Sequence, residues 1–92
     1  MKDIILDLTP FADKISLHSY LKETLDFPFY YGANLEALHD ELTSETHATR
    51  IIVQYPAQPK GKMVDYLPRL LRVFEDAACE NYHLEISYRE VA

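Results

Sequence analysis

Three short hydrophobic runs along the chain have the character of β-strands. Residues 4–8 form a short, mostly apolar run that Thr9 and Pro10 end, which is typical of a mostly buried strand. Residues 50–55 are rich in β-branched side chains, and residues 83–89 alternate between apolar and polar positions. The pattern therefore predicts three strands, of which the last has one face in water.

Two stretches between the first and second strands have helical spacing. In the first, positions i, i+3, i+4 and i+8 form one stripe, which consists of Leu17, Tyr20, Leu21 and Leu25. Phe27 and Pro28 end this helix, because a proline disfavours helical geometry in the residue before it. In the second, a shorter stripe with spacing i, i+3 and i+7 consists of Leu35, Leu38 and Leu42. Asn34 is expected to cap this helix, and residues 43–49 break its pattern.

A third helical stretch follows the second strand. Its broad apolar face consists of Leu67, Leu70, Leu71, Phe74, Ala77 and Ala78. Asp65 is expected to cap this helix and Pro68 to lie in its first turn, while Cys79 is expected to be a buried, unreactive thiol. Strands separated by helical crossovers are normally parallel. We therefore expect an α/β fold, with a three-stranded parallel sheet and helices packed against it.

The length and composition fit one domain over residues 1–92. About 64% of the surface of so short a chain can be buried on folding, and 48% of the residues are hydrophobic, as in folded proteins. The single cysteine excludes an internal disulfide, and the apolar run near the N-terminus is too short for a signal peptide or a membrane span. We expect a cytoplasmic protein that is monomeric when free and makes no membrane contact.

The charge of the chain bears on its partners. Fifteen acidic residues against nine basic ones leave a net charge of −6, which disfavours nucleic acid and favours a cationic partner. The only basic cluster consists of Lys60, Lys62, Arg69 and Arg72. No recognisable nucleic-acid-binding module accompanies this cluster, so RNA binding through it is a weaker alternative.

Acidic residues gather between positions 23 and 49, a stretch without Lys or Arg. Glu36 and Asp40 are spaced i, i+4 on one helix face, where like charges repel. Asp40 and Glu41 also lie toward the helix C-terminus, where the helix dipole disfavours negative charge. Local stability does not favour this arrangement, whereas a positive partner would neutralise it.

Other interpretations of these residues stay open at this point. The acids could form a solvated face, or Glu36 and Asp40 could act as a general acid and base. Glu36 and His39 have the spacing of half a metal-binding motif, but its second half is missing. His18 and His83 look like core-edge or surface histidines. We expect no catalytic residue, no metal and no cofactor.

Residues 25–43, LDFPFYYGANLEALHDELT, resemble the barstar family, which comprises intracellular inhibitors of barnase-like ribonucleases. The matching residues are Pro28, Tyr30, Tyr31, Gly32, Asn34, Leu35, Ala37, Leu38, Asp40, Leu42 and Thr43, with Glu36 in place of an aspartate. Weaker similarity covers most of the chain and is poorest over residues 44–63. The family fold is a three-stranded parallel sheet with helices, as the hydrophobic pattern also predicts.

The resemblance implies a non-enzymatic inhibitor that forms a 1:1 complex with a basic ribonuclease of the secreted or toxin type. Asp40 would occupy the place of a substrate phosphate. The residues implied in partner binding are Tyr30, Asn34, Glu36, His39, Asp40, Thr43 and Asp76. His39 stands where barstar has a tryptophan, and Ser44 and Glu45 replace a nearby aromatic residue, so apolar contact area is lost. The alternative is an interaction module with the same fold and another protein target.

Overall fold

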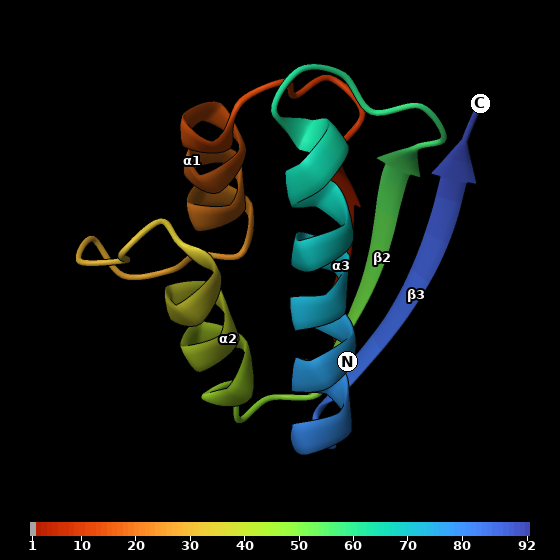
Figure 1. Cartoon of the computed structure of the whole chain (residues 1–92). Coiled ribbons are helices and arrows are strands. Elements are labelled where there is room, and N and C mark those ends of the chain that lie inside the picture. The colour runs from red at the N-terminus through yellow and green to blue at the C-terminus, as the bar shows by residue number, and fades with distance from the viewer. Residues whose placement is uncertain (1) are drawn as a thin grey trace.

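Strands and helices follow one another in the order that the hydrophobic pattern predicts (Figure 1). The computed structural model describes residues 2–92. Its elements are β1 (Lys2–Asp7), α1 (Lys14–Thr24), α2 (Leu35–Thr43), β2 (Thr49–Pro56), α3 (Met63–Glu80) and β3 (Leu84–Val91). No helix among these residues is long and apolar enough to cross a bilayer.

The three strands form one parallel sheet in the order β1-β2-β3, which confirms the predicted fold class. Ile51 of β2 lies opposite Ile4 of β1 on one side and Ile86 of β3 on the other. Because right-handed crossovers run in one direction across the sheet, the helices cover the same face. Figure 1 shows them on that side.

The core lies between this covered face and the helices. Leu6 and Val53 are fully buried there, whereas Ile5 points to the opposite face and is 56% exposed. The helices contribute the other large side chains of the core, which include Leu17, Leu21, Leu38, Leu70 and Phe74. The alternation along each strand therefore decides which side chains meet the helices.

The ends of α2 and α3 confirm one sequence prediction, for Asn34, and correct two, for Asp65 and Pro68. Asn34 caps α2, because its Oδ1 accepts a hydrogen bond from the Ala37 amide at 2.7 Å. Asp65 does not cap α3, since a turn at Gly61 starts this helix earlier, at Met63, where no side chain caps it.

For the same reason Pro68 lies in the second turn of α3 and not in its first. The missing N–H of the proline leaves the Val64 carbonyl without its helical donor. The prediction of a buried Cys79 is also wrong, because this thiol is exposed. The buried side of the helix includes Phe74 and Ala77. Cys79 lies two positions beyond Ala77, which places it on the opposite side of the helix.

Candidate functional site

A shallow groove between α2 and α3 brings together three residues that the sequence singles out. Glu36, His39 and Asp40 line it from α2 together with Leu35, and Val73 lines it from α3. Its volume is about 320 Å³. The predicted acid pair therefore does share a face of α2, and this face borders the second helix.

The carboxylate of Asp40 is highly exposed at this groove. Its side chain is 83% exposed, and the ring of His39 lies beside it, with Nδ1 4.0 Å from Asp40 Oδ1. The hydroxyls of Thr43 and Ser44 donate to the backbone carbonyl of Asp40, at 3.2 and 2.7 Å, and so help to satisfy the helix C-terminus. The end of α2 is therefore held without using the Asp40 carboxylate.

His39 joins the two helices that form the groove. Its Nε2–H donates to Glu80 Oε2 at the end of α3, and its side chain is 35% exposed. This contact places the Glu80 carboxylate beside the acids of α2. Sequence reasoning missed Glu80, because nothing in the local pattern links residues that are 41 positions apart.

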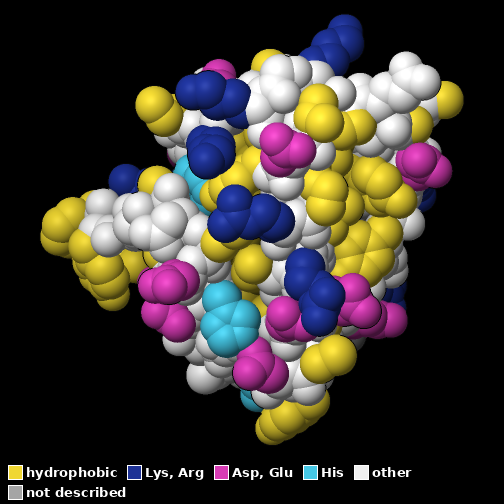
Figure 2. All heavy atoms as spheres, viewed as in Figure 1, with side chains coloured by type: hydrophobic (Ala, Val, Ile, Leu, Met, Phe, Trp, Pro, Cys, Tyr) yellow, Lys and Arg dark blue, Asp and Glu magenta, His cyan; other side chains and the backbone are white. Residues whose placement is uncertain are grey.

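Asp76 lies on the same side of α3 as Val73 and Glu80, by helical spacing. Its Oδ1 accepts a hydrogen bond from Arg72 Nε at 3.4 Å, so its charge is partly compensated on its own helix. We call Glu36, Asp40, Asp76 and Glu80 the acidic surface. Figure 2 shows acidic side chains around a histidine in the lower half of this face, below a group of basic ones.

The loop between α1 and α2 carries exposed aromatic side chains. Tyr30 is 71% exposed and Phe29 is 87% exposed, and their rings meet edge to face with centroids 5.5 Å apart. Figure 1 shows this loop projecting from the body of the protein beside α2. We call Phe29 and Tyr30 the aromatic tip. Sequence reasoning missed Phe29, although three consecutive aromatic residues in a loop are a usable signal.

The next residue of the loop, Tyr31, anchors the aromatic tip to the core. Its hydroxyl lies 2.7 Å from His18 Nδ1, and His18 Nε2 lies 2.6 Å from the Tyr66 hydroxyl. The ring of Tyr31 also packs on Phe27, with centroids 4.8 Å apart. His18 is only 1% exposed, so its expected place at the surface or core edge is corrected to the core itself. It connects α1, the loop and α3.

Asn34 and Thr43 use their polar groups at the two ends of α2. Asn34 Nδ2 donates to the Gly32 carbonyl at 3.2 Å, in addition to the cap described above. The Thr43 hydroxyl donates to the His39 carbonyl at 2.8 Å. These contacts shape the helix ends on either side of Asp40, and a direct role of both residues in partner binding stays a prediction.

The buried position of His18 predicts a pH dependence of stability. Burial lowers the pKa of His18, and the nearby charge of Lys14 lowers it further. Below about pH 6.5 the unfolded chain therefore binds a proton at His18 that the folded chain does not, so the free energy of unfolding falls as the pH falls, by at most about 1.4 kcal/mol per pH unit. Urea unfolding at several pH values measures this slope.

The control for this prediction is His18→Gln, which retains donor and acceptor groups but does not titrate. We expect the parent to lose more stability than the Gln variant between about pH 7.5 and about pH 5. An equal loss in both proteins would show that other groups cause the dependence.

No group of three or more His, Cys, Asp or Glu side chains is placed to hold a metal ion within residues 2–92. The one histidine of the half motif, His39, is engaged by Glu80. The groove is open and its acids lie in water, so no carboxyl group there is desolvated in the way that general acid catalysis requires. The arrangement is therefore best suited to binding cations of a partner.

Comparisons of the sequence with known proteins show the family of the chain. The family model described as "Barstar (barnase inhibitor)" matches residues 1–89. The chain therefore belongs to the barstar family, as residues 25–43 indicate. It is also similar to the "Putative ribonuclease inhibitor YrdF" of Bacillus subtilis (strain 168), with 54% identity over 43 residues. That match spans about half of each protein, 47% of this chain and 47% of the relative.

Proposed function

We propose that this protein inhibits a basic, barnase-like ribonuclease by placing its acidic surface in the active site of the enzyme, in a 1:1 complex. The observation that carries the proposal is the exposed Asp40 carboxylate, which is free of hydrogen bonds among the described residues and flanked by Glu36 and Glu80. Membership of the barstar family supports ribonuclease inhibition in general. The acidic surface supports the finer part of the proposal.

The physical basis lies in the enzyme that would be bound. A ribonuclease holds the phosphate of its substrate with cationic side chains, and a carboxylate can make the same charge-assisted hydrogen bonds. Asp40 takes this position in the proposed complex, and Glu36 lies one helical turn earlier as a supporting charge. Docking also relieves the repulsion between these two acids, which the free protein bears.

The proposed mechanism is occlusion and not turnover. The groove of about 320 Å³ is shallow, and its acids stand outward from α2. Such a surface fits a concave, positively charged site, because its protruding carboxylates can enter the site that RNA would otherwise occupy. RNA and the inhibitor then compete for the same cations.

The test is a titration of the protein into a barnase-like ribonuclease while RNA cleavage is followed. We expect cleavage to stop at one equivalent. The association rate should also fall as salt rises from about 0.05 to 0.5 M, since screening weakens the attraction between the acidic surface and the enzyme. Glu36→Gln should reduce this salt dependence, whereas Asp3→Asn, on the far face of the sheet, should change it less.

Two outcomes would count against the proposal. An association rate that does not respond to salt would exclude a basic target for the acidic surface. Tight binding to a protein without nuclease activity, combined with no inhibition of any barnase-like enzyme, would support the alternative of an interaction module with another target.

A further inference from the structure

The outer edge of β3 is unpaired among the described residues. β3 lies at the end of the sheet, and within residues 2–92 it pairs only with β2, along its full length of eight residues. Exposed strand edges offer free backbone donors and acceptors, and proteins often block them with proline or a bulge. The sequence LEISYREV of β3 contains no proline.

The backbone of β3 shows which residues face this free edge. The carbonyls of His83 and Val91 accept hydrogen bonds from β2 and the residue that follows it, both at 2.8 Å. Because successive residues of a strand direct their backbone groups to opposite sides, the odd-numbered residues face β2 and the even-numbered ones face away. The N–H and C=O groups of Ile86, Tyr88 and Glu90 therefore lie on the free edge.

The residue order of β3 is complementary to itself. If a second β3 pairs antiparallel with the first about a two-fold axis at Ser87, Ile86 lies opposite Tyr88 and Glu85 opposite Arg89, each pair occurring twice. Ile86 and Tyr88 would exchange backbone hydrogen bonds. Glu85 and Arg89 would form the other class of pair, in which side chains approach more closely.

Charges on the far face of the sheet favour this register. Asp3, Arg50 and Glu85 lie side by side across the three strands, and Arg50 Nε is 3.1 Å from Glu85 Oε2. Arg89 is next to Gln54 in a parallel row and has no ion pair within residues 2–92. Pairing in this register would place Arg89 of the second copy next to Glu85. Negative and positive side chains would then alternate from Asp3 across the boundary between the two copies.

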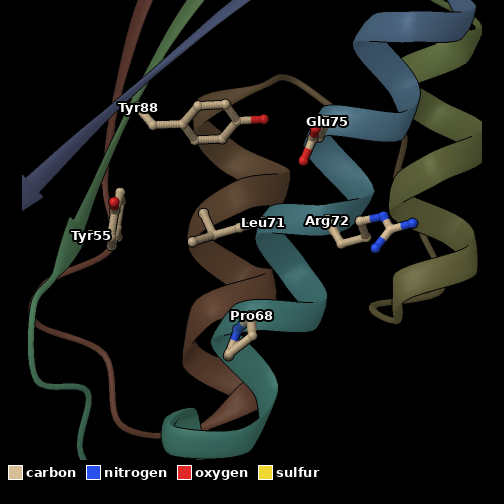
Figure 3. A pocket seen from close by; sticks show the side chains of 6 residues that line it. All are labelled: Tyr55, Pro68, Leu71, Arg72, Glu75 and Tyr88. Carbon is tan, nitrogen blue, oxygen red and sulfur yellow. The ribbon is translucent and has the colours of Figure 1, made fainter.

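The covered face of the sheet is also incomplete at this edge. A groove of about 400 Å³ lies between α3 and the ends of β2 and β3 (Figure 3). Figure 3 shows Tyr88 projecting from the strands toward Glu75 of α3, while Leu71 projects from α3 toward Tyr55. Tyr88 is 42% exposed, although it lies on the same face of β3 as the buried Leu84. In the register above, Ile86 of the second copy lies beside Tyr88 and covers part of its ring.

We propose that β3 binds β3 of a second copy of this chain, in the antiparallel register centred on Ser87. The resulting dimer has one continuous sheet and keeps the helices of each copy on the same face. No acid of the acidic surface takes part in this strand pairing, so the inference does not depend on the proposed function. Edge pairing of one strand is a small interface, so we expect monomers in dilute solution and dimers at high concentration.

Sedimentation equilibrium of the unmodified protein at concentrations up to about 1 mM, the weak end of specific association, tests the proposal directly. We expect a monomer–dimer equilibrium. Arg89→Glu and Glu85→Arg should each weaken it at least about tenfold, because both ion pairs become repulsive. A mixture of the two variants should form heterodimers, since every 85–89 pair then joins opposite charges. Arg69→Glu is the matched control, with the same charge change on α3, and should leave dimerisation intact.

Amide hydrogen exchange of the unmodified protein gives a second measurement that needs no variant. The amides of Ile86 and Tyr88 should become protected as concentration rises, while that of Ser87, which faces β2, should not change. A monomer at every concentration, or a mixture of folded charge variants that associates no better than either alone, would overturn the proposal.

Discussion

Replacing Asp40 with alanine is expected to weaken ribonuclease binding more than any other single truncation. The carboxylate is 83% exposed in the free protein and would be desolvated against cations in the proposed complex. Its removal leaves those cations buried without a partner, which costs about 2–5 kcal/mol of binding free energy. This range of free energies was obtained in part from barstar complexes, so it is what we expect for a member of the family. Stopped-flow and competition kinetics with the inhibited enzyme measure the loss.

The stability of the Asp40→Ala variant is an internal control for this experiment. Because the carboxylate makes no hydrogen bond among residues 2–92 and lies near a helix C-terminus, urea unfolding should show a variant at least as stable as the parent. Asp3→Ala removes the same charge from the far face of the sheet and should change affinity little. A loss below about 1 kcal/mol for Asp40→Ala would place the contact surface elsewhere.

The second large effect is expected at the aromatic tip. Combined truncation of Phe29 and Tyr30 to alanine should weaken ribonuclease binding by about 2–4 kcal/mol, the range of aromatic interface hot spots. Both rings are already exposed, and the hydrogen bonds from Tyr31 to His18 and from His18 to Tyr66 hold the loop that carries them. Little ordering is then needed on binding, so most of the contact energy contributes to affinity.

Phe29 is the residue that distinguishes this prediction from one based on the family pattern alone. His39 and Glu45 provide less apolar area than the aromatic residues of the family pattern, and Phe29 is a large exposed side chain in the loop that leads into α2. Each single variant, Phe29→Ala and Tyr30→Ala, should therefore bind the ribonuclease more weakly than the parent. Ile15→Ala, on α1 and 83% exposed, is the control and should bind as the parent does. Unchanged affinity of the double variant would exclude the aromatic tip from the interface.

The order of strands and helices could be predicted from the sequence because it depends on local periodicity. Runs such as residues 50–55 cannot form an amphipathic helix, and the spacing of Leu35, Leu38 and Leu42 cannot form a strand with one buried face. Parallel pairing then follows, since helical segments separate the strands. The acid pair of Glu36 and Asp40 was also predictable, because residues spaced i, i+4 share a helix face whatever surrounds the helix.

The tertiary structure alone decided how these charges and polar groups are paired. His39 bonds to Glu80, 41 residues away, and His18 bonds to Tyr66, 48 residues away. Such contacts depend on how α1, α2 and α3 pack on the sheet, and neither periodicity nor capping residues specify that packing. The same packing buries His18, although a histidine near the surface is the commoner case. The free edge of β3 is likewise a property of the assembled sheet, because the number of neighbours of a strand is settled only when all strands have paired.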